Sequence, residues 1–158
     1  MSHQANALAD LQSKLNTETH VSDWYTVTQE NINLFAEATG DHQWIHTDPE
    51  RAKAQSPFGT TIAHGYMTLS LIVMLTDSVD PENPPYEGVV MGINYGCNRV
   101  RFPNPVAVNS KIRSRTTLIN VEEKGNALQI VNKVTIEIEG VQKPGCVAET
   151  VSRLYFSN

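Results

Sequence analysis

The sequence lacks the features of several large protein classes. Its 158 residues include only two cysteines, Cys97 and Cys146, too few for the disulfide framework of a small secreted fold and too far apart for a Cys-x-x-Cys metal pair. We therefore expect a reduced compartment and no structural zinc. The longest apolar run, over residues 69–75, is far shorter than the roughly 20 residues that span a bilayer. The N-terminus has no secretory signal, so a cytoplasmic protein without membrane contact is predicted by elimination.

Positive charge is also scarce. The net charge of −5 argues against a general nucleic-acid partner, which needs a basic face to neutralise phosphates. The chain has no GxxxxGK[ST] or GxGxxG loop and no GxSxG turn, which disfavours nucleotide-dependent and serine hydrolase chemistry. What is present is an ordinary globular balance of 40% hydrophobic and 18% charged residues. We expect one domain over residues 1–158.

The first half of the chain is mostly helical in pattern. The longest predicted helix is apolar on most sides, so it must be buried nearly all round. Thr28 is placed to cap one helix that Gly40 ends, and Asp48 followed by Pro49 is typical of another helix start. The predicted helices cover residues 7–15, 28–40, 49–55 and 64–79, with a short strand at 23–27.

The second half changes to long strands rich in Val, Ile and Thr, two of which alternate clearly with period two. The predicted strands cover residues 88–102, 111–123, 127–140 and 143–156, with turns at 123–126 and 139–145 and a Pro-rich surface loop at 80–88. A buried helix with several antiparallel strands is an α+β class in which the sheet wraps the helix, the hotdog fold in outline. Such a sheet leaves an edge exposed, so we expect at least a homodimer.

Asp41 and His46 are the first candidate catalytic residues. They lie in the stretch GDHQWIHTDPERA, which has more titratable groups than a surface loop needs. A histidine supplies a base near neutral pH, and a nearby carboxylate can orient water or the imidazole. His64 and Gly65 come at the start of the predicted buried helix, where free N–H groups favour a developing oxyanion. Together these groups suit proton transfer next to a carbonyl and reversible addition of water.

The stretches ATGDHQWIHTDPERA and SPFGTTIAHGYMTLSL resemble the MaoC-like dehydratase family, in particular its nodulation protein N-like branch. The resemblance extends over about residues 25–156. It implies an (R)-specific enoyl-CoA hydratase or 3-hydroxyacyl-thioester dehydratase in fatty-acid metabolism that uses no cofactor. The substrate would be an acyl thioester of coenzyme A or of acyl-carrier protein. Asp41 and His46 would be the catalytic pair that activates water, and the Gly65 amide would bind the thioester carbonyl.

The match to this family has departures. Gln43 and Trp44 stand where the family has Asn-Pro, so Trp44 is expected to reshape the pocket or to pack under the loop. A serine on the central helix of some hydratases aligns with Val73, which leaves Asn98 to orient the aspartate. Arg99 and Arg101 alternate on one strand face, as do Lys111, Arg113 and Arg115. A solvated outer face explains most of these cations, and one or two would meet the phosphates of coenzyme A.

Simpler interpretations stand beside these. His42 is expected at the surface, Asp48 as a helix cap, and Tyr66 and Met67 in the core. His64 is expected to hydrogen-bond a carbonyl and shape the turn rather than to catalyse.

Three functional alternatives also remain. A metal site could use His42 and His46, four residues apart, with Asp41, Asp48 or His64, but that spacing needs a helix and the predicted helix begins only after His46. The second is a hotdog acyl-CoA thioesterase, which would need a carboxylate on or beside the buried helix, whereas this helix has none before Asp77. The third is a non-catalytic acyl-CoA-binding protein.

Overall fold

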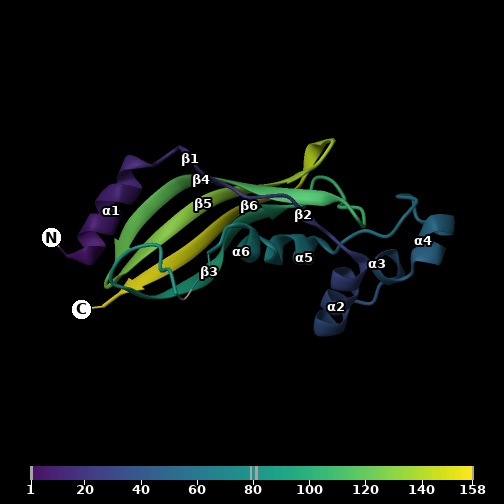
Figure 1. Cartoon of the computed structure of the whole chain (residues 1–158), viewed down its shortest axis with the longest axis horizontal. Coiled ribbons are helices and arrows are strands. Elements are labelled where there is room, and N and C mark those ends of the chain that lie inside the picture. The colour runs from purple at the N-terminus through teal and green to yellow at the C-terminus, as the bar shows by residue number, and fades with distance from the viewer. Residues whose placement is uncertain (1, 79, 81, 158) are drawn as a thin grey trace.

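The structure is a computed structural model that describes residues 2–78, 80 and 82–157. One antiparallel sheet dominates it, with strand order β1-β4-β5-β6-β3 and β2 paired with β4 (Figure 1). The predicted α+β class is confirmed. The strands are β1 (Glu18–Val21), β2 (Tyr25–Thr26), β3 (Val89–Arg101), β4 (Lys111–Lys124), β5 (Ala127–Ile138) and β6 (Val141–Phe156). The helices are α1 (His3–Ser13), α2 (Gln29–Thr39), α3 (Trp44–Thr47), α4 (Pro49–Gln55), α5 (Gly65–Ser70) and α6 (Ile72–Leu75).

The sheet has an inner face, which packs against α5 and α6, and an outer face turned to solvent. Alternate residues of β4, from Ile112 to Leu118, are buried on the inner face, as period-two patterning predicts. The outer face of the same strand is polar, and its Arg113 and Arg115 pair with Glu137 and Glu18. The expected solvated face is confirmed for these two arginines.

The central helix departs from prediction. Instead of one helix over 64–79, α5 and α6 are separated at Leu71, although the N–H of Leu71 still donates to the Met67 carbonyl and keeps the axis continuous. The prediction that this helix is buried on all sides is wrong, because the sheet covers only one side of it. Tyr66 is 71% exposed and is not the core residue expected, whereas Met67 is buried. Residue 79, at the end of the predicted helix, and residue 81, in the predicted loop, lie outside the described residues.

α1 covers His3–Ser13 rather than the predicted residues 7–15, because the Ser2 hydroxyl caps it. Most other element boundaries follow local signals closely. The Thr28 hydroxyl caps α2, Gly40 ends it at φ 76°, and Asp48 caps α4. Two strand predictions need correction. β6 begins at Val141 because Glu139 and Gly140 suffice for the hairpin turn, with Gly140 at φ 74°. β1 was not predicted, because it is a short polar edge strand that only its pairing with β4 reveals.

The ends of the sheet carry different helices. α1 lies at one end with both termini, whereas α2, α3 and α4 extend beyond the other end (Figure 1). Among the described residues no helix is both long and apolar enough to cross a membrane. Cys97 is exposed and Cys146 is buried, and both are free thiols.

Candidate active site

The segment that follows α2 places Asp41 at the edge of the helical extension. Gly40 adopts the left-handed conformation that ends α2, and its N–H donates to the Ala36 carbonyl. The chain then turns, with the N–H of Gln43 donating to Asp41 Oδ1 at 3.4 Å. The Asp41 carboxylate is therefore held near the backbone turn while it remains exposed to solvent.

His46 is buried in α3, a short helix that the sequence did not predict. Only 7% of the residue is exposed. Its Nδ1 lies 2.6 Å from the carbonyl oxygen of Ile62, which accepts a hydrogen bond, so Nδ1 carries the proton. This contact fixes the tautomer and leaves Nε2 with a free lone pair, the form needed for a general base.

Gln29 holds the backbone of His46, a role that no feature of the sequence predicts. Its side-chain amide donates to the His46 carbonyl at 2.7 Å. Its Oε1 accepts a hydrogen bond at 2.5 Å from the hydroxyl of Thr61, which is fully buried. Gln29 thus joins the first turn of α2 to the two segments that carry and anchor His46. A glutamine at the start of a helix looks like an ordinary surface residue until the tertiary contacts are known.

We predict that Gln29→Leu lowers kcat for acyl-thioester hydration about tenfold with little change in KM, because His46 loses its backbone anchor and small misplacements are costly. Steady-state kinetics measure both constants. Gln55→Leu, at an exposed residue of α4, is the matched control and should behave as wild type. Unchanged kcat in a folded Gln29→Leu protein would show that Gln29 does not position His46.

His64 packs against His46 in the core of the site. The two rings are stacked with their centroids 3.9 Å apart. The centroid of the Phe35 ring lies 5.0 Å from that of the His64 ring. His64 Nε2 donates to the Asp41 carbonyl at 2.9 Å, as expected for a histidine that shapes the turn. Its Nδ1 is one of three buried side-chain polar atoms without a partner among the described residues. It therefore offers a second free lone pair beside that of His46.

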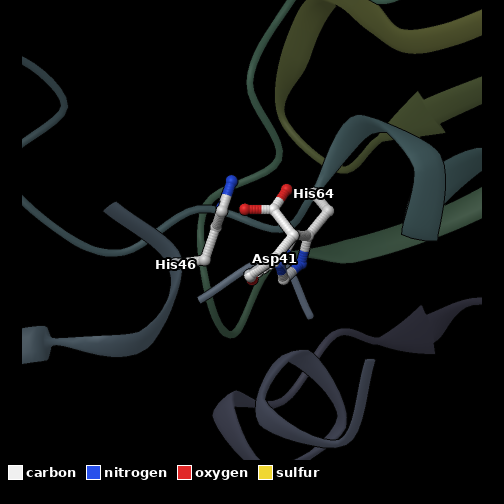
Figure 2. A group of neighbouring side chains, drawn as sticks. All are labelled: Asp41, His46 and His64. Carbon is white, nitrogen blue, oxygen red and sulfur yellow. Dashed lines mark hydrogen bonds between the residues drawn. The ribbon is translucent and has the colours of Figure 1, made fainter. Parts of the chain in front are cut away.

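These groups converge although they come from three segments. One polar atom each from Asp41, His46 and His64 lies within 4.8 Å of the other two. Figure 2 shows the Asp41 carboxylate beside the two imidazole rings. Because both rings use one nitrogen on a backbone carbonyl, the atoms left for a bound molecule are His46 Nε2, His64 Nδ1 and the carboxylate oxygens. The arrangement can hold one water between acceptors and position it for attack.

Burial sets the charge of His46. Desolvation lowers the pKa of His46 below its ordinary value near 6.5, and the positive form of His64 lowers it further. The hydrogen bond to Ile62 and the charge of Asp41 act in the opposite direction and only partly offset the burial. His46 is accordingly neutral at pH 7 and available as a base.

We predict that acidification destabilises the wild type more than His46→Asn. The folded protein resists protonation of His46 but the unfolded chain does not. The unfolded chain therefore binds the extra proton as pH falls below about 6.5, and the free energy of unfolding decreases. Urea unfolding at pH 7.5 and 5.5 measures this difference. Equal losses in the two proteins would contradict the lowered pKa of His46.

The N-terminus of α5 supplies the third functional element. The first N–H groups of a helix lack intrahelical partners, and the Gly65 amide is the first of α5. A Cβ on Gly65 would lie 2.8 Å from the Phe102 ring, so the glycine is required for that ring to pack. The close backbone approach expected at Gly65 is therefore used at least in part by Phe102.

The remaining predicted site residues are not part of the cluster of Asp41, His46 and His64. Trp44 is half-buried and stacks under Arg51 of α4, as expected for a residue that packs under the loop. Asn98 is exposed in an irregular part of β3, and no hydrogen bond joins it to Asp41 among the described residues. Arg99 and Arg101 line a hollow of about 440 Å³ with Lys133 and Glu149, and none of the three cluster residues lines it.

Three residues of the central helix bear on the serine that some hydratases carry there: Thr68, Ser70 and Val73. Val73 lies in α6 and has no hydroxyl to offer. The hydroxyl of Ser70 in α5 donates to the Tyr66 carbonyl, and that of Thr68 donates to the His64 carbonyl. Both hydroxyls therefore serve the helix backbone.

The structure changes the set of residues that could form the alternative metal site. His42 is exposed with Nδ1 3.7 Å from Glu37, and Asp48 caps α4, so neither joins His46. The only group that could ligate a metal among the described residues is Asp41, His46 and His64. Each of its histidines has one nitrogen on a backbone carbonyl, so each offers one nitrogen beside the Asp41 carboxylate, a set of ligand types that zinc also uses. Because the family resemblance implies no cofactor, we expect the cluster to bind water rather than a metal.

We predict that chelation leaves activity unchanged. Protein dialysed against EDTA should hydrate substrate at the rate of untreated protein, and added Zn²⁺ should not increase it. Metal analysis of the same samples provides the control. Loss of activity on chelation that Zn²⁺ restores would show that the three groups hold a metal.

Comparison with known protein families shows which family this chain belongs to. The MaoC-like domain matches residues 10–140. The chain belongs to the MaoC-like dehydratase family. It is 51% identical over 148 residues to 3-hydroxyacyl-thioester dehydratase Z of Mycobacterium tuberculosis, covering 93% of this chain and 95% of that protein. It is 42% identical to nodulation protein N of Rhizobium leguminosarum bv. viciae, covering 95% and 92%.

The fold agrees with this membership. The R-hydratase PhaJ1 from Pseudomonas aeruginosa superposes with a TM-score of 0.65 at 18% identity, covering 90% of this chain and 83% of that one. At that identity the likeness concerns the fold alone, and it confirms the hotdog fold for this MaoC-like dehydratase. The resemblance inferred from the stretches around Asp41 and His64 is confirmed as well.

Proposed function

We propose that the protein is a hydro-lyase that adds water reversibly to trans-2-enoyl thioesters, or removes it from (R)-3-hydroxyacyl thioesters. The observation that carries this proposal is the convergence of Asp41, His46 and His64, each with one polar side-chain atom within 4.8 Å of the other two. Membership of the MaoC-like dehydratase family supports it, as does the 51% identity to a protein named 3-hydroxyacyl-thioester dehydratase.

In the hydration direction, Asp41 and His46 bind one water. The water oxygen bonds to C3 as its proton passes to the pair, and the electrons of the C2–C3 double bond move toward the thioester carbonyl. The Gly65 amide donates to the enolate-like oxygen, which gains the negative charge. The pair then returns a proton to C2, so one molecule of water has been added and the protein is unchanged.

The thioester handle is coenzyme A or acyl-carrier protein. Arg99, Arg101 and Lys133 supply the positive charge that phosphates of either handle would need in a chain of net charge −5. Lys133 lies on the outer face of the sheet, so contact with the handle would have to run around the edge of the sheet.

We also propose a homodimer formed along β3. Among the described residues β3 pairs only with β6, which leaves its other edge unpaired. Exposed apolar side chains follow this edge and the open side of the central helix, among them Tyr66, Met74, Val90, Met91 and Tyr95. A second copy would satisfy the strand edge and cover these side chains. Sedimentation equilibrium tests this proposal against the 17.5 kDa chain mass.

The experiment for the proposed reaction follows the absorbance of the conjugated enoyl thioester on mixing with crotonyl-CoA. We expect the absorbance to fall and the product to be (R)-3-hydroxybutyryl-CoA by chiral analysis. Release of free coenzyme A thiol without loss of the double bond would instead show a thioesterase. Binding of acyl-CoA without turnover of any chain length, on coenzyme A or acyl-carrier protein, would show a non-catalytic acyl-binding protein.

A further inference from the structure

The inner face of the sheet carries polar residues where a helix-covered face is expected to be apolar. One or two polar side chains on each of four neighbouring strands form this polar belt: Thr116 on β4, Asn132 on β5, Thr150 and Ser152 on β6, and Asn94 on β3. The register pairs Asn132 with Thr150 and Asn94 with Ser152, so the belt crosses the sheet. It separates two hydrophobic clusters, one beneath the central helix and one against α1.

The polar belt lines two adjoining clefts of about 220 and 360 Å³. Asn94, Asn132 and Ser152 line both clefts, and Thr116 and Thr150 line the smaller one. Val73 of α6 and Thr76, the residue directly after α6, form the opposite wall. The space between the sheet and the end of the central helix is thus open and hydrogen-bonding rather than packed.

Two buried polar atoms at this cleft lack partners. Thr116 is 95% buried with its Oγ1 unpaired, and His20 Nδ1 beside it is also unpaired. They are two of the three such atoms among the described residues. A buried polar atom without a partner destabilises the protein, so its presence beside a cleft indicates a partner that enters from outside. The third such atom, His64 Nδ1, lies at the site of the proposed reaction.

One stripe of the central helix connects the cleft to that site. Gly65, Leu69, Val73 and Thr76 are spaced four, four and three residues apart, so they share one face of the helix, and all are half-buried. At 1.5 Å per residue, Val73 and Thr76 lie about 12 and 16 Å along the axis from Gly65. An extended chain advances about 1.2 Å per bond, so these distances correspond to roughly ten to thirteen bonds.

We propose that the protein binds acyl thioesters whose chain carries a neutral hydrogen-bonding substituent, a hydroxyl or keto group, about ten or more bonds from the thioester carbonyl, and that the polar belt holds it. The proposal rests on the proposed function, because the Gly65 amide fixes the carbonyl end of the chain. Amide and hydroxyl side chains both donate and accept, which suits a neutral group.

A charged substituent fits less well. Asp77 and Asp80 line the wider cleft and would repel a carboxylate. Lys14, which also lines it, is paired with Asp10 at 2.6 Å.

Calorimetric titration with dodecanoyl-CoA and its ω-hydroxylated analogue tests the polar belt. Neither probe can be hydrated, since each has a saturated chain. We expect the hydroxylated chain to bind about five- to tenfold more tightly, the size of one added hydrogen bond. Asn132→Leu and Thr150→Val should each reduce this preference. Thr135→Val, on the outer face of β5, is the matched control and should keep it.

Equal or tighter binding of the unsubstituted chain to wild type would overturn the proposal, as would a preference that survives both belt variants. Crotonyl-CoA is too short to reach the belt, so its hydration reports the proposed function alone. A preference for the hydroxylated chain without turnover of any enoyl chain length, on coenzyme A or acyl-carrier protein, would support the polar belt and contradict the hydro-lyase.

A variant of Thr116 separates an effect on ligand binding from an effect on folding stability. Because the Thr116 hydroxyl is buried without a partner, Thr116→Val should raise Tm by about 2–4 °C in the free protein. The same variant should lose part of the preference for the hydroxylated chain. A gain in stability together with a loss of preference supports a residue kept for binding. A fall in Tm, or an unchanged preference, would overturn the role of Thr116.

Discussion

Asp41→Asn lowers kcat/KM for hydration of crotonyl-CoA by at least about 10²-fold, the usual contribution of a general acid–base group. The substitution keeps the shape of the side chain and an oxygen for the N–H of Gln43, so the turn after Gly40 is retained. What it removes is the negative charge beside His46 and one of the acceptors for the bound water. The enoyl absorbance assay measures the loss, and circular dichroism verifies the fold.

Asp48→Asn is the matched control for this variant. The Asp48 carboxylate accepts a hydrogen bond from the N–H of Arg51 as the cap of α4, a role that asparagine fills equally well. Its kcat/KM should remain that of wild type. A folded Asp41→Asn protein with full activity would contradict the assignment of Asp41.

His46→Asn has an effect of similar size for a different reason. Asparagine can place an N–H near the position of Nδ1 and keep the bond to the Ile62 carbonyl, but it has no atom at Nε2. The variant therefore removes the free lone pair while it retains the anchor, and kcat should fall by at least about 10²-fold.

The control for the histidine is His42→Asn. His42 is exposed and faces Glu37, so this substitution should not change kcat. In wild type the acid limb of the kcat/KM profile should lie below pH 6.5, because burial lowers the pKa of His46. An acid limb above that value, or equal losses in the two variants, would contradict a neutral His46 as base.

The sequence was sufficient where local signals decide the structure. Gly40 ends α2, and Asp48 with Pro49 starts α4, because capping and backbone freedom act within a few residues. Alternation along β4 and β5 predicted their buried face for the same reason. Asp41 and His46 were candidates from their residue types within one short stretch, and the family resemblance gave them their proposed catalytic roles.

The rest of the site depends on contacts between distant segments. The stacking of His64 on His46 and the anchor from Gln29 link residues 17 or 18 positions apart through tertiary packing. The exposure of Tyr66 could not be predicted either, because an apolar helix gives no indication of which side the sheet covers. The polar belt had a faint signal, since Asn132 and Thr150 stand at inward positions of otherwise apolar strands.

The central claim is that Asp41 and His46 act as one unit on a single water, and the double variant Asp41→Asn/His46→Asn tests it most directly. Its kcat/KM for crotonyl-CoA should be about that of the slower single variant, because groups that act together lose their effect together. If the two losses instead multiply, the residues act independently and the account of the site is wrong.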